Sequence, residues 1–175
     1  MKKTLLLSLL AASSLMASSL IVTNGSVKAH TEVFGDSTID PVTKSITSHL
    51  SMGNSVESIK GSVDVSVRKL KSDNETRDEH MVEAIASDKY PLATYTFKSV
   101  TKTGNQYKID GILNFHGVQK PLSIKADIAE KPGSVALKGK ASFKMSDYGV
   151  KPPKLLLLTV RDRIDLSVNV TFKKK

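Results

Sequence analysis

Strict alternation of apolar and polar residues constrains the fold of this chain more than any other feature. A period of two residues is that of a β-strand with one apolar and one polar face. The clearest example is 163–172, and the same period occurs in 62–68, 94–98, 107–115, 122–128 and 135–145. The sequence therefore predicts a protein made mainly of strands.

Short turn signals separate these strands. Thr103-Gly104-Asn105 is typical of a hairpin loop, His116–Pro121 of a longer turn, and Lys131-Pro132-Gly133 of a third turn. Parallel neighbours need long crossover connections, whereas antiparallel neighbours can be joined by short ones. We therefore expect an antiparallel arrangement in which successive strands are neighbours.

One segment has helical rather than strand periodicity. Thr76 and Glu79 have the spacing of a capping box, and apolar residues follow on one helical face. Tyr90 precedes Pro91, which disfavours helical backbone there. The pattern predicts one short helix from about Arg77 to Ser87.

About eight strands with a polar and an apolar face must protect both their edges and their apolar surface. A closed barrel does both, whereas a sandwich is the structural competitor. We expect a mainly all-β protein, an eight-stranded antiparallel β-barrel with one short helix. Such a barrel is either filled by its own side chains or holds one small ligand, and the pattern leaves both open.

The N-terminus has the features of an export signal. Lys2 and Lys3 precede a short apolar run, and Val27-Lys28-Ala29 offers a cleavage point. We expect a signal peptide at 1–29, a single domain at 30–175, and a periplasmic location. The alternative is a membrane anchor that is not removed.

Composition and histidine spacing argue against catalysis. The chain has no cysteine, which excludes disulfides, thiolate metal sites and a cysteine nucleophile. Its histidines, His30, His49, His80 and His116, have no metal-binding spacing, and we expect structural roles for His80 and His116. The net charge of +9 is spread along the sequence, which does not favour nucleic-acid binding. We therefore expect neither an enzyme nor a metal or cofactor.

The segment Lys151–Leu158 combines two prolines with four consecutive leucines. Pro152 and Pro153 predict a stiff loop outside any central strand. The leucines fit either a short segment that is buried on both sides or an apolar rim at the entrance of a ligand site.

Several motifs, in order, resemble the YceI-like domain family. They cover roughly Asp40 to Phe172, and one departure is Met145, where the family usually has Arg. The motifs are Arg77–Met81, Lys89-Tyr90-Pro91, Phe97–Val100, Tyr107–Leu113, His116–Pro121, Gly139–Phe143 and Asp147–Val150.

The resemblance implies a lipocalin-like barrel that is exported and binds a long isoprenoid or similar amphiphilic lipid, such as a quinone or polyprenyl chain. It implies carriage or storage of that lipid without catalysis and without another cofactor. Transient contact with a membrane surface is expected, and a monomer and a homodimer both stay open. The alternatives are a stress-responsive interaction protein with a filled barrel and, less favoured, an enzyme of isoprenoid metabolism.

The inward parity of the strands predicts which side chains contact such a lipid, although each could equally be ordinary core. The expected ligand-binding residues are Val65, Val67, Tyr95, Phe97, Ile109, Leu113, Phe115, Ile124, Phe143, Leu166 and Val168.

Overall fold

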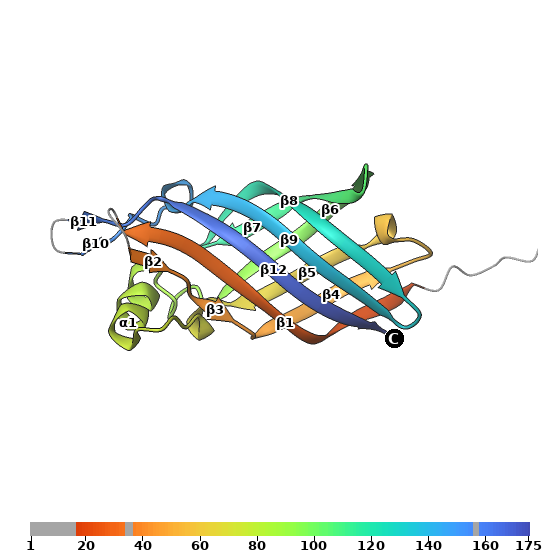
Figure 1. The fold of residues 1–175 in the computed structure, drawn as a ribbon, viewed down its shortest axis with the longest axis horizontal. Coiled ribbons are helices and arrows are strands. Elements are labelled where there is room, and N and C mark those ends of the chain that lie inside the picture. Colours follow the sequence, from red (N-terminus) through yellow and green to blue (C-terminus); the bar gives the residue numbers. More distant parts are fainter. Residues whose placement is uncertain (1–16, 34–36, 156–157) are drawn as a thin grey trace, which may run out of the picture.

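The computed structural model of the 175-residue chain describes residues 17–33, 37–155 and 158–175, and most of them lie in strands (Figure 1). The long strands are β1 (Ser18–Val33), β4 (Ile46–Met52), β5 (Lys60–Ser66), β6 (Leu92–Thr103), β7 (Gln106–Phe115), β8 (Val118–Lys131), β9 (Ser134–Lys144) and β12 (Arg163–Lys174). The short strands are β2 (Ser37–Ile39), β3 (Val42–Thr43), β10 (Lys154–Leu155) and β11 (Leu158–Thr159). Helical segments are the α-helix α1 (Glu75–Ala84) and the 3₁₀ turns η1 (Val56–Ser58), η2 (Val67–Lys69) and η3 (Met145–Tyr148).

The eight long strands form a closed antiparallel barrel, which confirms the predicted fold class. Their order is β12-β9-β8-β7-β6-β5-β4-β1, and β1 returns to pair with β12 from Leu20↔Lys174 to His30↔Asp165. Closure joins the two edges of the sheet through β1, although β1 pairs with β4 only at Ser18–Leu20. Alternation directs every second side chain into the interior.

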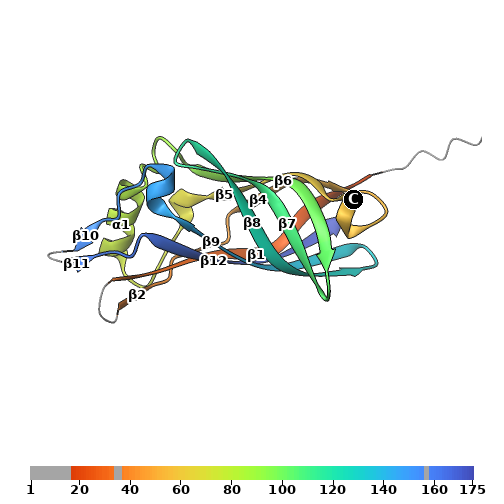
Figure 2. The ribbon, with the colours of Figure 1, turned by 90° about the horizontal axis from the view of Figure 1, so that it is seen from above.

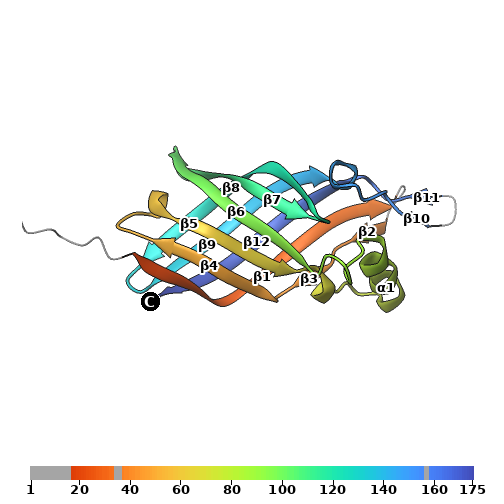
Figure 3. The ribbon, with the colours of Figure 1, turned by 180° about the vertical axis from the view of Figure 1, so that it is seen from behind.

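The barrel has two different ends, which lie at opposite sides of Figures 1 and 3. We call the end with α1 and the β10–β11 hairpin the mouth end, and the end with η1 and the C-terminus the far end. Figure 2, a view from above, also places α1, β10 and β11 together at one end of the barrel.

Each end has its own apolar cluster. At the far end Leu20, Leu50, Met52 and Val135 are at most 3% exposed, so this part of the interior is packed solid. At the mouth end Met81 of α1 and Ile85, which follows the helix, pack in a second apolar cluster. Its other members come from β1, β2, η2, η3, β12 and the residues that precede β12. The named residues of the far end are among the least exposed of the interior, and the mouth end is closed over by the second cluster.

The helix starts earlier than the capping-box pattern predicts. Its N-cap is Asn74, whose side chain accepts a hydrogen bond from the Arg77 backbone N–H at 2.9 Å, so the prediction of Thr76 was wrong. Asn is a stronger N-cap than Thr. The buried Asp78 carboxylate accepts from the Ser72 N–H at 2.8 and 3.0 Å and thereby holds the preceding loop against the helix.

The turn after β7 is shorter than predicted. His116 and Gly117 have φ of 52° and 76°, which gives a two-residue hairpin turn, and β8 begins directly afterwards. Pro121, predicted to lie in the turn, pairs with Ile112 inside β8. The β8–β9 pairing begins only at Lys125. Pro121 therefore lies outside this pairing, and its lack of an N–H removes no hydrogen bond to β9.

Basic residues that are scattered in the sequence form a row on the outer face. Lys108 on β7 lies opposite Lys125 on β8, which lies opposite Lys140 on β9. All three are exposed, and Lys108 also pairs with Asp110 at 2.9 Å. Like charges directly opposite one another destabilise a sheet, so this row is unfavourable unless an anionic partner faces it.

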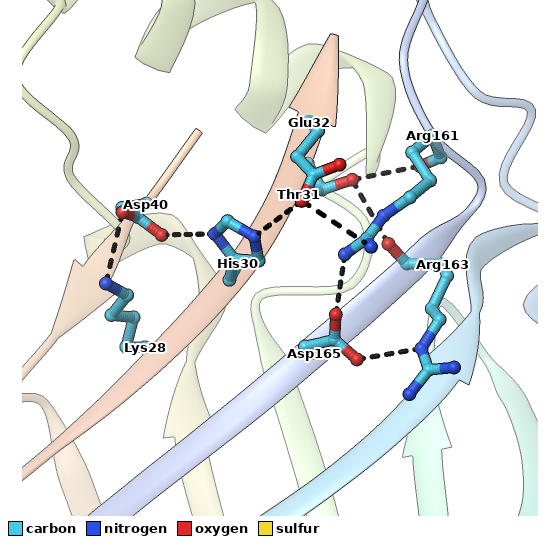
Figure 4. Close-up of polar contacts among 8 residues, drawn as sticks. All are labelled: Lys28, His30, Thr31, Glu32, Asp40, Arg161, Arg163 and Asp165. Atoms are coloured by element: carbon cyan, nitrogen blue, oxygen red, sulfur yellow. Dashed lines mark hydrogen bonds and ion pairs between the residues drawn. The ribbon is translucent and has the colours of Figure 1, made fainter. Parts of the chain in front are cut away.

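Figure 4 shows a polar network on the β1–β12 seam that closes the barrel. His30 on β1 has Nδ1 at 2.7 Å from Asp40 Oδ1 and Nε2 at 3.2 Å from Glu32 Oε1. Across the seam Arg161 and Asp165 lie 2.6 Å apart, and Arg161 Nη1 lies 3.7 Å from Glu32. The network therefore connects the segment after β1 with the strand that closes the ring.

Buried hydroxyl and charged groups strengthen the same seam. Thr31 Oγ1 lies 3.0 Å from the carbonyl oxygen of Arg161 and 3.1 Å from that of Arg163. Desolvation opposes the charged form of Asp165, but hydrogen bonds from Arg163 and Arg161 outweigh it and lower the pKa of this carboxyl group. The charged groups are thus paired along the β12 side of the seam, where Asp165 lies in register with His30 of β1.

Both ring nitrogens of His30 face carboxylates, so both act as donors when the ring is protonated. Hydrogen bonds to Asp40 and then to Glu32 raise the pKa of His30 above 6.5. The hydrogen bond from His30, with help from Lys28, lowers the pKa of Asp40 below 3.8 despite partial desolvation. The stability that the protonated His30 adds is complete below the pKa that His30 has in the unfolded chain. It is lost as pH rises through the higher pKa that His30 has in the folded protein. The Asp40 contribution is complete above its unfolded pKa and is lost as pH falls through the folded value.

We predict that His30→Gln destabilises the barrel most at pH values between the folded-state pKa of Asp40 and that of His30. At about pH 5.5 the loss should reach at most about 1 kcal/mol, the scale of partly exposed ion pairs, and it should shrink by about pH 8.5. Urea unfolding of both proteins at the two pH values measures the difference. An equal loss at both pH values would mean that His30 contributes only by packing.

The position of β1 generates a second prediction. Cleavage after Ala29 would remove every β1–β12 pair except His30↔Asp165, together with the β1–β4 pairs of Ser18–Leu20. A chain that starts at Ser18 should therefore fold cooperatively, whereas a chain that starts at His30 should not. Circular dichroism during thermal unfolding distinguishes them. A native-like transition in the shorter chain would show that β1 is dispensable and would agree with cleavage after Ala29.

Candidate ligand-binding cavity

The barrel encloses a cavity of about 460 Å³ that reaches toward the mouth end. This volume lies within the usual range for small-molecule sites. On β12 five successive inward residues line it, from Ile164 to Phe172. At about 3.3 Å per residue these positions span roughly 26 Å of strand, so the space is elongated along the barrel.

The exposure of inward-facing residues locates the hollow part. Val63, Leu166 and Val168 are apolar and line the cavity, yet they are only partly buried. Leu20 and Val135 at the far end are 1% and 0% exposed and do not line it. An apolar side chain that faces the inside of a barrel stays accessible only where it borders a space, so the cavity ends at the packed far end.

All of the predicted ligand-contact residues line this cavity, and whether they contact a ligand stays a prediction. They are Val65, Val67, Tyr95, Phe97, Ile109, Leu113, Phe115, Ile124, Phe143, Leu166 and Val168.

Other residues that line the cavity were not predicted from the sequence, for two reasons. Val27 and Ala29 were assigned to the signal peptide, although in β1 they alternate as the other strands do. Met81 belongs to α1 and Ile85 is its C-cap residue, and the side of a helix that meets a cavity depends on where the helix docks. The alternation in 25–33 is the signal that could have found Val27 and Ala29.

Aromatic rings form a rigid part of the wall. Phe115 and Phe143 line the cavity and pack edge to face at 5.6 Å between centroids, and both contact the buried Tyr148, at 5.7 and 5.1 Å. Edge-to-face packing is a favoured geometry of aromatic pairs. These rings give the hollow part of the barrel a wall that does not depend on a ligand.

Tyr95 presents its ring to the cavity because its hydroxyl is engaged by the wall. Tyr95 Oη lies 2.8 Å from the carbonyl oxygen of Leu122 and 3.1 Å from that of Ile109. Burial, with the nearby Asp110 charge, raises the pKa of Tyr95, so the phenol stays neutral. Gly111 makes room for the ring, since a Cβ there would lie 2.4 Å from Tyr95 Cζ.

The histidines are distributed without a common site. His49 contacts Asp64 at 3.1 Å on the outer face, and His116 Nδ1 lies 3.0 Å from the Tyr148 carbonyl oxygen beside the turn, which fits the structural role expected for it. His80 instead lines the cavity. Among residues 17–33, 37–155 and 158–175, no three His, Asp or Glu side chains are grouped as a metal site would require.

Part of the Lys151–Leu158 segment borders the cavity. Pro153 and Lys154 line it, and β10 and β11 form a two-stranded hairpin at the mouth end. The predictions for the leucine side chains fall on 155–158, outside the described side chains. No helix in the described part of the chain is long and apolar enough to cross a membrane.

Comparison with known proteins identifies this barrel. The sequence model of the YceI-like domain matches residues 18–172. The chain belongs to the YceI-like domain family. A UPF0312 protein of Pseudomonas putida strain F1 is 31% identical over 131 residues, which cover 68% of this chain and 65% of that protein. The protein YceI of Shigella flexneri is 27% identical over 119 residues, which cover 63% of this chain and 61% of the relative. The chain thus spans less than two thirds of these YceI-like relatives.

Solved structures share the fold. Burkholderia cenocepacia BcnA superposes with a TM-score of 0.74 at 14% identity, over 84% of this chain and 95% of BcnA. A Campylobacter jejuni YceI protein superposes with a TM-score of 0.55 at 18% identity, over 100% of this chain and 94% of its own. The YceI family match includes Ser18–Ala29, in agreement with the place of these residues in β1.

We predict that a larger side chain in the cavity reduces ligand uptake, whereas a larger side chain in the packed far end reduces stability. Val168→Phe adds volume where the cavity is open, so it should abolish uptake of the neutral apolar dye N-phenyl-1-naphthylamine at little cost in stability. Val135→Phe, at a residue that is 0% exposed, should cost about 1–3 kcal/mol by overpacking. Dye fluorescence and urea unfolding of both variants measure the contrast. Equal destabilisation by both would show that the interior around Val168 is already full.

Proposed function

We propose that this YceI-like protein binds a long isoprenoid or similar amphiphilic lipid, such as a quinone or polyprenyl chain, and carries or stores it without chemical change. The observation that supports this most is the elongated apolar cavity, which reaches toward the mouth end and is blocked at the far end. A filled barrel, the main alternative, would leave no such volume.

The energetics favour a long tail over a compact ligand. Transfer of each methylene from water into the cavity contributes about 0.8 kcal/mol. Association costs about 4–15 kcal/mol in lost translational and rotational freedom. Burial of a short chain contributes too little free energy to offset this cost, whereas burial of a long chain can offset it. The neutral Tyr95 and the aromatic wall offer no charge that would oppose a hydrocarbon chain at that depth.

We propose further that the protein acts in the periplasm and meets membranes transiently. The charged start and apolar run of the N-terminus support export. The row Lys108–Lys125–Lys140 supports contact with anionic lipid headgroups, since each basic residue near such a surface adds about 1 kcal/mol of attraction. The proposed role includes neither a nucleic-acid partner nor a chemical reaction.

A homologous series of n-alcohols from octanol to eicosanol tests the proposal by calorimetry. Each added methylene should lower the dissociation constant about fourfold, until the cavity is full and the affinity levels off. The Val168→Phe variant should level off at a shorter chain than the wild type. Absence of binding, or an affinity that does not depend on chain length, would contradict a lipid-binding role.

A further inference from the structure

The charges that line the cavity are all of one sign. Among the described residues that line it, Arg77, Lys154 and the histidine His80 are the ionisable groups besides Tyr95, and none of the lining residues is Asp or Glu. Arg77 and His80 belong to α1 and Lys154 to β10, so all three come from elements at the mouth end. The rest of the lining is almost entirely apolar, so polar recognition is confined to this end.

Polar contacts hold the Arg77 side chain in place, but the carboxylate that pairs with it is exposed to solvent. Its side chain is 26% exposed, and Nη1 lies 3.3 Å from Asp73 Oδ1 and 3.4 Å from the Thr38 carbonyl oxygen. Asp73 is 90% exposed, so this pair is a solvent-screened one of small energy. A guanidinium has five N–H donors, and these contacts use a single nitrogen of it.

Lys154 lines the same cavity from β10, a different element at the mouth end. Long basic side chains place their methylene stems along apolar surface and keep the charged group in water. Such a stem would explain how an exposed lysine also lines an apolar cavity. The basic groups thus lie at the end of the cavity at which the polar head of a ligand would lie if its tail extended toward the far end.

From this arrangement we propose that the mouth end is a binding site for an anionic headgroup, a carboxylate or a phosphate, on the lipid whose tail fills the barrel. Arg77 and Lys154 supply the positive charge, and His80 supplies a hydrogen bond. The proposal rests on lipid binding as the function and names the chemical class of the lipid.

Ligands matched in the tail separate the headgroup from the hydrocarbon. Palmitate, cetyl phosphate and cetyl alcohol are titrated into the wild-type protein, where at least one anion should bind roughly tenfold more tightly than the alcohol. This preference should weaken at high salt because the site is partly exposed. The stronger of the two anions identifies whether a carboxylate or a phosphate is the preferred source of the charge.

Variants assign the preference to the named residues. Arg77→Met and Lys154→Met keep the apolar stems and should each reduce the ratio of anion affinity to cetyl alcohol affinity severalfold. Arg77→Lys should retain most of the preference. Lys151→Met is the matched control, because Lys151 is exposed and does not line the cavity, and it should change neither affinity. If Arg77→Met fails to fold, Lys154→Met carries the same comparison.

The outcomes distinguish this inference from the proposed function. Equal binding of anions and alcohol, or a preference that survives both methionine variants, would overturn the headgroup site while leaving lipid binding intact. Failure of all three ligands to bind would instead overturn the proposed function and this inference with it.

Discussion

The pairing of β1 with β12 is the interaction on which the rest of the structure depends. It joins the two ends of the chain along ten registered residue pairs and turns a sheet with two open edges into a closed ring. Closure gives the inner face no contact with a second layer of structure, so the only means of burying inward side chains is the interior of the ring itself. The ion pairs around His30 and Asp165 reinforce this seam from the outside (Figure 4).

The ring is filled unequally, and the difference between its ends gives the molecule its proposed chemistry. Large aliphatic residues such as Leu20 and Met52 occupy the far end completely. Farther along the barrel the cavity is bordered by small inward side chains such as Val63, Ala93 and Val168, together with the aromatic wall. Because one end is blocked, a long guest would insert tail first and leave its polar head among the basic residues of the mouth end.

The fold was predictable because the strand period fixes which residues face inward, whatever the neighbouring strands are. This is why each predicted contact residue, from Val65 to Val168, lines the cavity. Prediction from the sequence failed where something other than the strand period determined the position of a residue. Val27 and Ala29 lie next to a run that also fits a leader, and β4 (Ile46–Met52) carries polar residues at several positions and has a weak alternation. Asn74 rather than Thr76 begins α1 because the contact of Asp78 with Ser72 fixes the preceding loop. Arg77 could not be placed at the cavity from its own sequence, since only the docking of α1 brings it there.

Native mass spectrometry of the protein, purified without detergent, tests the central claim most directly, since it detects any guest together with the chain that encloses it. If the hollow interior serves to hold a lipid, the spectrum should show the polypeptide with one noncovalent adduct of lipid mass, released at modest collision energy and absent from Val168→Phe. A spectrum that shows only the bare polypeptide, even after incubation with long-chain lipids, would contradict the claim that this barrel is built to enclose an apolar guest.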